Sequence, residues 1–264
     1  DQSRAVEGGL AADYVNFSAE PDMARLVDDG IVSANWDKGP THGMVTNSVV
    51  VFVVRKGNPK HIHTWADLVK PGVKIVTPDP ASSGSAKWNI LAAYGQVLAR
   101  GGSAADAKAY LTKFFEHTVA LPSSGRDATT AFESGNGDVL ISYENEAILA
   151  RAEGADFDYL VPDQTILIQN PAAVTKTANP LTKKWLAYVL SKPAQTTFYH
   201  YGFRPVLPGI HTSVPGANDP NNPFPTPKVL LTIKNFRGWT AADAKFFDNS
   251  TSIVPTIQTE TGKQ

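Results

Sequence analysis

Serines and glycines gather at two points of the chain where an extended segment gives way to a helix. Residues 79–89 read DPASSGSAKWN, and residues 123–125 read SSG. A third extended segment, within GDVLISYENEAILA, ends on an aromatic residue. Serine at a helix start can simply cap it by accepting a backbone N–H, but small residues there can also expose N–H groups to an anion, which the helix dipole favours. Both interpretations, capping and an anion cradle, stay open. The candidate cradle residues are those of the two loops, 82–85 and 123–125, together with Tyr143 at the end of the third segment.

Repeated strand-to-helix units place these loops at the ends of strands. The patterns predict strands near 13–18, near 118–121 and up to Tyr143, each followed by a helix. An apolar stripe over 90–98 predicts an amphipathic helix after the first serine loop. Such units are typical of an α/β fold with a mainly parallel sheet, in which ligands bind beyond the carboxyl ends of the strands.

Two long apolar segments look like crossings between lobes. Residues 48–54 and 165–168 form β-type runs with polar exits, and they bracket the region that holds both serine loops. We therefore expect a two-lobed protein with its ligand in the cleft between lobes joined by two crossing strands. The expected division is residues 1–50 and 167–264 for the first lobe, and 51–166 for the second.

Composition excludes several classes of function. The formal net charge of −1, without any basic run, argues against nucleic-acid binding. No stretch reaches the roughly 18 to 20 apolar residues of a membrane span. The absence of cysteine excludes disulfides and thiol chemistry, and no motif calls for a cofactor.

Two enzyme interpretations are weaker alternatives. His61 and His63 could bind a metal, but alternating histidines in a polar turn are more often solvated, so we expect no metal site. A serine nucleophile within SSGSA would lack the nucleophile-elbow pattern and a histidine nearby in sequence. A metal- or serine-dependent hydrolase therefore ranks below a binding protein.

Several segments in order resemble the bacterial sulfate- and thiosulfate-binding proteins of ABC importers, a branch of the type II periplasmic binding proteins. They are VKIVTPDPASSGSAKWNILAAYG, SSGRDATTAF, GDVLISYENEAILA, FYHYGFRP and GWTAADAKFF. The resemblance implies a monomeric receptor that captures sulfate or thiosulfate without cofactor and delivers it to permease subunits in the membrane. Molybdate, tungstate or another tetrahedral oxyanion is the alternative ligand.

Carried over residue by residue, the resemblance selects five contact residues from these segments. Ser83, Gly84 and Ser85 would donate at one helix start, Gly125 at a second, and Tyr143 would be the aromatic donor. The family usually has Ser-Gly-Gly and Trp at these positions, so Ser85 and Tyr143 depart from it. A pocket of donors suits sulfate, which carries no proton at neutral pH, and leaves the O–H of phosphate unpaired.

Charged neighbours and the cellular location also follow from the resemblance. Asp22 and Arg126 would hold the loops as charges behind the contact residues. The family implies a further strand and a serine-containing loop before Asp1, and an export or lipoprotein signal before those. We therefore expect the protein in the periplasm or on the outer face of the cytoplasmic membrane, with a lipid anchor as one form of attachment.

Overall fold

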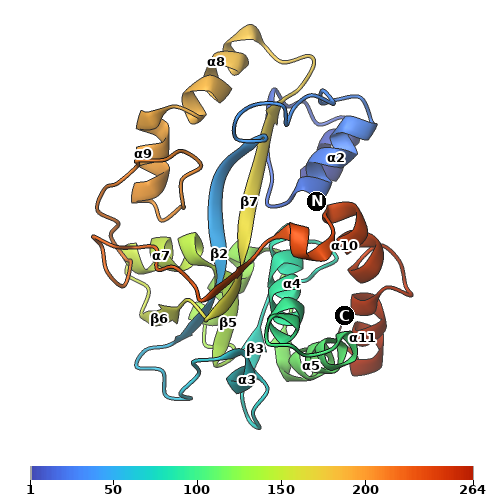
Figure 1. The fold of residues 1–264 in the computed structure, drawn as a ribbon, viewed down its shortest axis with the longest axis vertical. Coiled ribbons are helices and arrows are strands. Elements are labelled where there is room, and N and C mark those ends of the chain that lie inside the picture. Colours follow the sequence, from blue (N-terminus) through green and yellow to red (C-terminus); the bar gives the residue numbers. More distant parts are fainter. Residues whose placement is uncertain (1, 264) are drawn as a thin grey trace. The chain divides into compact units, whose positions relative to one another are not determined.

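The computed structural model describes residues 2–263 and divides the chain into two compact units (Figure 1). The first unit contains Asp1–Ser48 and Ile168–Phe224, and the second contains Val49–Leu167 and Pro225–Gln264. Strands β2 (Met44–Arg55) and β7 (Gln164–Val174) each contain one of the points where the chain passes between units. A third passage follows Phe224. Within residues 2–263, no helix combines the length and apolar character needed to cross a membrane.

The first unit is a small sheet with helices. Its elements besides parts of β2 and β7 are α1 (Gln2–Glu7), β1 (Tyr14–Asn16), α2 (Glu20–Asp28), α8 (Pro180–Val189) and α9 (Lys192–His200). Strand β1 pairs antiparallel with β7, and α2 begins with a proline in its first turn, as the sequence predicts. Met23 and Leu26 of α2 are fully buried in the core beneath this helix.

The second unit holds both serine loops. Its elements besides the remaining parts of β2 and β7 are α3 (Trp65–Leu68), β3 (Ile75–Val76), α4 (Gly84–Ala99), α5 (Ala104–His117), β4 (Thr118–Ala120), α6 (Gly125–Glu133), β5 (Val139–Tyr143), α7 (Glu144–Ala152), β6 (Phe157–Leu160), β8 (Val229–Leu231), the 3₁₀ helix η1 (Ile233–Phe236), α10 (Trp239–Phe246) and α11 (Ile253–Thr261).

The sheet is mixed rather than mainly parallel, which corrects the sequence prediction. Strand β3 lies between β5 and β4 and is parallel to both, whereas β2 pairs antiparallel with β5 and with β6. The strand-to-helix units therefore account only for the three strands that precede α4, α6 and α7. The long crossing strands add the antiparallel pairs.

Helix α4 is the centre of the second unit. From Ser85 to Val97 every side chain except Lys87 is buried, so the helix is enclosed rather than amphipathic as its apolar stripe predicted. Helix α5 packs along it, and β8 crosses near Gly95, where an added Cβ would lie 2.6 Å from a methyl of Leu231. A helix covered on nearly all sides needs few polar positions.

The carboxyl-terminal segment belongs to the second unit, whereas the expected division assigned it to the first lobe. Trp239 packs edge-on against Trp88 of α4, with ring centroids 4.6 Å apart. Lys87 forms an ion pair with Asp243 at 2.7 Å, and α11 packs on α5. Through these contacts with α4 and α5, residues 225–264 follow the second unit.

Candidate oxyanion site

Three helices begin at one edge of the second unit's sheet. Strands β3, β4 and β5 are parallel neighbours, so their carboxyl ends lie at the same edge, and α4, α6 and α7 follow them; Figure 1 labels β3, β5, α4 and α7. The first N–H groups of a helix have no partner within the helix and carry the positive end of its dipole. This edge therefore concentrates backbone donors.

The two serine loops are in direct contact. The hydroxyl of Ser82 donates to the carbonyl of Ser123 at 2.8 Å. A Cβ added to Gly125 would lie 3.1 Å from Oγ of Ser85, so the start of α6 approaches the first turn of α4 as closely as a glycine allows. The structure thus brings Ser83, Gly84, Ser85 and Gly125 together, as the sequence predicts.

Ser83 does not cap its helix. It occupies the N-cap position of α4, but its side chain accepts no bond from the first turn; its hydroxyl instead lies 2.8 Å from the hydroxyl of Ser85. Both side chains are buried. The first-turn N–H groups of α4 are therefore not capped by the side chain of Ser83.

Ser124 behaves in the opposite way. Its hydroxyl accepts the backbone N–H of Asp127 at 3.1 Å and donates to the Asp127 carboxylate at 2.8 Å. Hydrogen bonds from the hydroxyls of Ser123 and Ser124 lower the pKa of Asp127. Capping therefore holds for one N–H of α6, that of Asp127, and the sequence contains a signal for it: an acid stands three residues after Ser124, whereas Ala86 stands three residues after Ser83.

Asp79 organises the first loop, and sequence reasoning did not single it out. Its carboxylate accepts the N–H of Ala81 at 2.9 Å, and its carbonyl accepts the N–H of Ser83 at 2.9 Å. Its own N–H donates to the carbonyl of Pro122 in the second loop at 2.8 Å. The Asp-Pro pair at 79–80 was the available signal, because it favours a turn.

Tyr143 ends β5 and is the N-cap residue of α7. Its side chain is 7% exposed, and its strand lies beside β3, from which α4 follows. The amide of Asn89, one turn into α4, donates to the carbonyl of Ile141 at 3.0 Å and so connects that helix to β5. Tyr143 therefore stands at the same sheet edge as the serine loops.

The cations nearest this edge are already paired. Lys87, in the first turn of α4, is neutralised by Asp243. Arg126, next to Gly125, contacts Glu146 of α7 through Nε at 3.1 Å and thereby ties α6 to α7. The donors left for a ligand are N–H dipoles and hydroxyls rather than free positive charges, which can replace the hydration of an anion.

Asp22 lies in the first unit, in the first turn of α2. Its carboxylate accepts the hydroxyl of Ser3 at 2.5 Å and so links α2 to α1. The sequence prediction was that Asp22 and Arg126 support the same loops. In the structure the hydrogen bond of Asp22 is to Ser3, and the ion pair of Arg126 is with Glu146.

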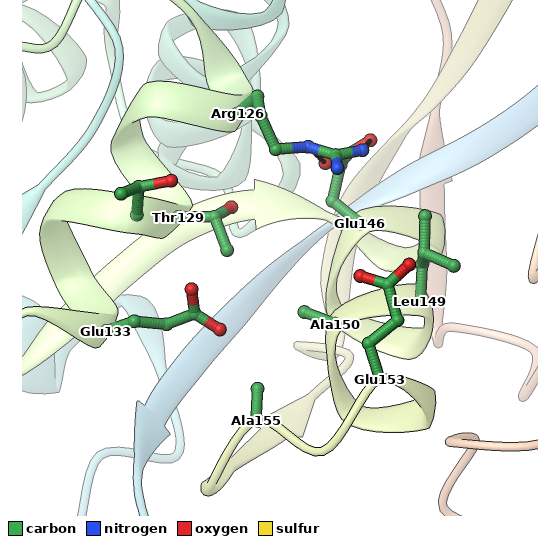
Figure 2. A pocket seen from close by; sticks show the side chains of 9 residues that line it. Arg126, Thr129, Glu133, Glu146, Leu149, Ala150, Glu153 and Ala155 are labelled. Atoms are coloured by element: carbon green, nitrogen blue, oxygen red, sulfur yellow. Dashed lines mark hydrogen bonds and ion pairs between the residues drawn. The ribbon is translucent and has the colours of Figure 1, made fainter.

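A hollow of about 240 Å³ between α6 and α7 is a different feature (Figure 2). Figure 2 shows the Arg126–Glu146 pair at one side and the carboxylates of Glu133 and Glu153 directed toward the same space. None of the five predicted contact residues lines it. With three carboxylates and one cation, this hollow repels anions and is not the oxyanion site.

The two histidines of the metal interpretation precede α3 rather than α4, α6 or α7. His61 and His63 are adjacent to α3, and the backbone N–H of His63 donates to the carboxylate of Asp67 at 3.0 Å. Within residues 2–263, His, Asp and Glu form no group of three or more that could hold a metal ion.

Comparison with known proteins identifies the family. Residues 1–204 match the model of the bacterial extracellular solute-binding proteins. The chain belongs to this family. A sulfate-binding protein from Synechococcus elongatus is 37% identical over 93% of this chain and 71% of its own length. A thiosulfate-binding protein from Pseudomonas aeruginosa is 33% identical over 93% of this chain and 76% of its own.

A solved structure gives the same result for this solute-binding protein. The sulfate-binding protein SubI from Mycobacterium tuberculosis H37Rv is 44% identical, with a TM-score of 0.87 over 94% of this chain and 85% of that one. The α/β fold of the periplasmic solute-binding proteins, predicted from the sequence, is thereby confirmed.

Proposed function

We propose that this protein is the sulfate receptor of an ABC importer, and that the starts of α4 and α6 together with Tyr143 supply the donors of its second unit. The observation that carries the proposal is the uncapped start of α4 beside Gly125. Local sequence offers serines for capping, yet Ser83 leaves the N–H groups of the first turn to another acceptor. An anion of high charge density fits that requirement.

The chemistry of the donors favours sulfate over phosphate. Backbone N–H groups can only donate, and both nearby cations are paired with carboxylates. Sulfate at neutral pH needs donors alone, whereas phosphate keeps a proton that requires an acceptor. An unpaired buried O–H costs about 1 to 3 kcal/mol, which corresponds to a factor of about 5 to 150 in affinity.

Thiosulfate is the second candidate, because one of the relatives is named for it. It shares the charge and tetrahedral shape of sulfate but carries one longer bond. Ser85 fills space beside Gly125 where the family usually has a glycine, so we assign to Ser85 a role in restricting the larger anion. Molybdate and tungstate, with longer bonds still, would be restricted in the same way.

Capture and release of an unchanged anion involves no catalysis. We propose that the protein does this outside the cytoplasmic membrane, as a monomer that delivers its ligand to permease subunits. The extracellular character of the family and the binding-protein names of the relatives support this view. A lipid anchor would keep the receptor close to the permease.

Calorimetric titration with sulfate, thiosulfate, molybdate and phosphate tests the assignment. We expect sulfate to bind most tightly and phosphate most weakly at a pH where phosphate is largely monoprotonated. The variant Ser83→Ala should bind sulfate less tightly, while Ser134→Ala, at the far end of α6, serves as the matched control. Tighter binding of phosphate than of sulfate would overturn the proposal.

A further inference from the structure

Helix α8 carries an exposed apolar stripe. Leu181, Trp185 and Tyr188 are 66%, 51% and 50% exposed, which is unusual for large apolar side chains in a folded unit. Their spacing of four and three residues puts them on one face of the helix. The residue that α8 buries, Val189, lies one turn after Trp185 and packs with Val45 and Ala172 in the core of the first unit, so the exposed stripe runs directly beside the buried side of the helix.

The aromatic rings of this stripe support one another. The rings of Trp185 and Tyr188 have centroids 5.7 Å apart, and Tyr14 of β1 meets Trp185 edge-on at 6.5 Å. These contacts restrict the rings before any partner arrives. We call Tyr14, Leu181, Trp185 and Tyr188 the aromatic face.

The chain around the aromatic face is strongly basic. From Gln164 to Asn218 the sequence contains no Asp or Glu but five basic residues, leaving 19 basic against 25 acidic residues elsewhere. Lys183, Lys184 and Lys192 are exposed and form no ion pair with any residue from 2 to 263. One carboxylate, that of Asp13, approaches the start of α8, where it accepts the N–H of Asn179 at 3.3 Å.

We infer that α8 rests on the surface of an anionic lipid bilayer. Trp and Tyr are suited to the boundary between headgroups and acyl chains, because one end of each side chain is apolar and the other polar. Lys184, next to Trp185, would extend its charged end toward lipid phosphates, and Lys183 and Lys192 add positive charge to the same segment, as in amphipathic helices that lie in the membrane interface. A second copy of the chain fits less well, since a symmetric contact would bring these lysines against their own counterparts.

This inference uses the proposed function only for the location of the protein outside the cytoplasmic membrane. The four residues of the aromatic face and the three lysines all lie in the first unit, whereas the donors assigned above lie in the second. Sulfate affinity and lipid binding can therefore be measured, and can fail, separately. Reversible attachment through α8 would keep the receptor in the layer of solution next to the permease.

Co-sedimentation with vesicles tests the inference on the full chain. We expect binding to vesicles of phosphatidylcholine containing phosphatidylglycerol, little binding to phosphatidylcholine alone, and release at high salt. The affinity of the variant Lys183→Gln/Lys184→Gln for the anionic vesicles should be lower by a factor of at least about ten. The variant Lys108→Gln/Lys113→Gln removes the same charge from exposed positions of α5 and should bind as the parent does.

The aromatic face is tested by Trp185→Ser/Tyr188→Ser. Both side chains are exposed, so the variant should fold, which its thermal midpoint checks, and it should keep its sulfate affinity while losing vesicle binding. Three results would overturn the inference: equal binding to neutral and anionic vesicles, equal loss in the α5 control, or retained binding without Trp185 and Tyr188. A concentration-dependent dimer that Trp185→Ser abolishes would identify a second copy as the occupant instead.

Discussion

The hydroxyl oxygens of Ser83 and Ser85 lie 2.8 Å apart at the start of α4, so one of these hydroxyls donates to the other. The accepting hydroxyl keeps its own hydrogen for another partner. A pair of serines two residues apart thus holds one donor in a fixed direction, beside the backbone N–H groups of the first turn. This relationship explains why a residue in the N-cap position need not cap.

Removing the first hydroxyl should weaken anion binding. Ser83→Ala deletes a donor to a charged acceptor in a desolvated site, and we expect sulfate affinity to fall by about 1 to 3 kcal/mol, with the fold intact because no capping bond is lost. Calorimetry measures the dissociation constant. Binding as tight as that of the Ser134→Ala control would show that Ser83 does not face the ligand.

The contact between Gly125 and Ser85 predicts a coupled pair of variants. In Gly125→Ala the new methyl would lie 3.1 Å from Oγ of Ser85, tighter than an ordinary contact, so Ser85 must shift by a few tenths of an ångström, and we expect sulfate binding to weaken. Ser85→Gly in the same chain removes the obstacle and should restore part of the affinity. A double-mutant cycle measures this coupling, and strictly additive losses would contradict it.

Ser85→Gly alone should change selectivity rather than abolish binding. It returns the loop to the Ser-Gly-Gly pattern that the family usually has, and it vacates the space next to Gly125. We expect the affinity ratio of thiosulfate to sulfate to rise. Competition titrations of the parent and the variant give this ratio, and an unchanged ratio would separate Ser85 from ligand discrimination.

Tyr143 is predicted to donate to the anion. Tyr143→Phe should lose about 1.5 to 3 kcal/mol of sulfate binding, because the bond is to a charged acceptor. Tyr143→Trp keeps a donor that cannot accept and should discriminate more strongly against hydrogen phosphate. Titrations of both anions against each variant check this, and full sulfate affinity in Tyr143→Phe would mean that the phenol points elsewhere.

Asp67, at the start of α3, should make stability depend on pH. Burial alone would raise its pKa, but hydrogen bonds from Lys70, His63 and Thr64 outweigh burial and hold the pKa well below its usual range. A lowered native pKa stabilises the fold above the unfolded value of about 4, and this contribution disappears as pH falls from there toward the native value. Asp67→Asn should therefore unfold about 1 to 3 kcal/mol more easily at pH 7.

Urea unfolding at pH 7 and at successively lower pH measures that difference. The difference in unfolding free energy between the parent and Asp67→Asn should shrink below pH 4, as the carboxyl of Asp67 becomes protonated in the unfolded parent chain. Asp106→Asn offers a comparison, because Asp106 forms a similar capping box at α5 on the surface. A difference between parent and Asp67→Asn that stays constant with pH would refute the assignment.

Local patterns predicted the parts of the site that depend on neighbouring residues in the chain. The β-branched runs and the serine-glycine loops located the ends of β4 and β5 and the helices that follow them, within two or three residues. The choice between capping and cradle also had a local basis, since Asp127 can pair with Ser124 whereas Ala86 has no side-chain group to pair with Ser83. No local sequence pattern predicted that the crossing strand β2 pairs antiparallel with β5.

Distant parts of the chain decided what local patterns could not. The enclosure of α4 depends on Trp239 and its neighbours, some 150 positions from Trp88 in the chain. The spacing of apolar residues within α4 does not predict this contact. The same holds for Asp22, whose partner Ser3 belongs to a short first helix. The charges that neutralise Lys87 and Arg126 likewise come from other elements.

Because residues 225–264 join the second unit, the two ends of the chain report on different units: α1 belongs to the first and α11 to the second. The sequence contains no cysteine, so two introduced at exposed positions, Ala5 in α1 and Glu260 in α11, would be the only thiols available for dyes. Energy transfer between dyes at these two positions would follow any movement of one unit against the other as sulfate is added. If the last forty residues had belonged to the first unit, both dyes would lie on that unit, and energy transfer between them would not detect the movement.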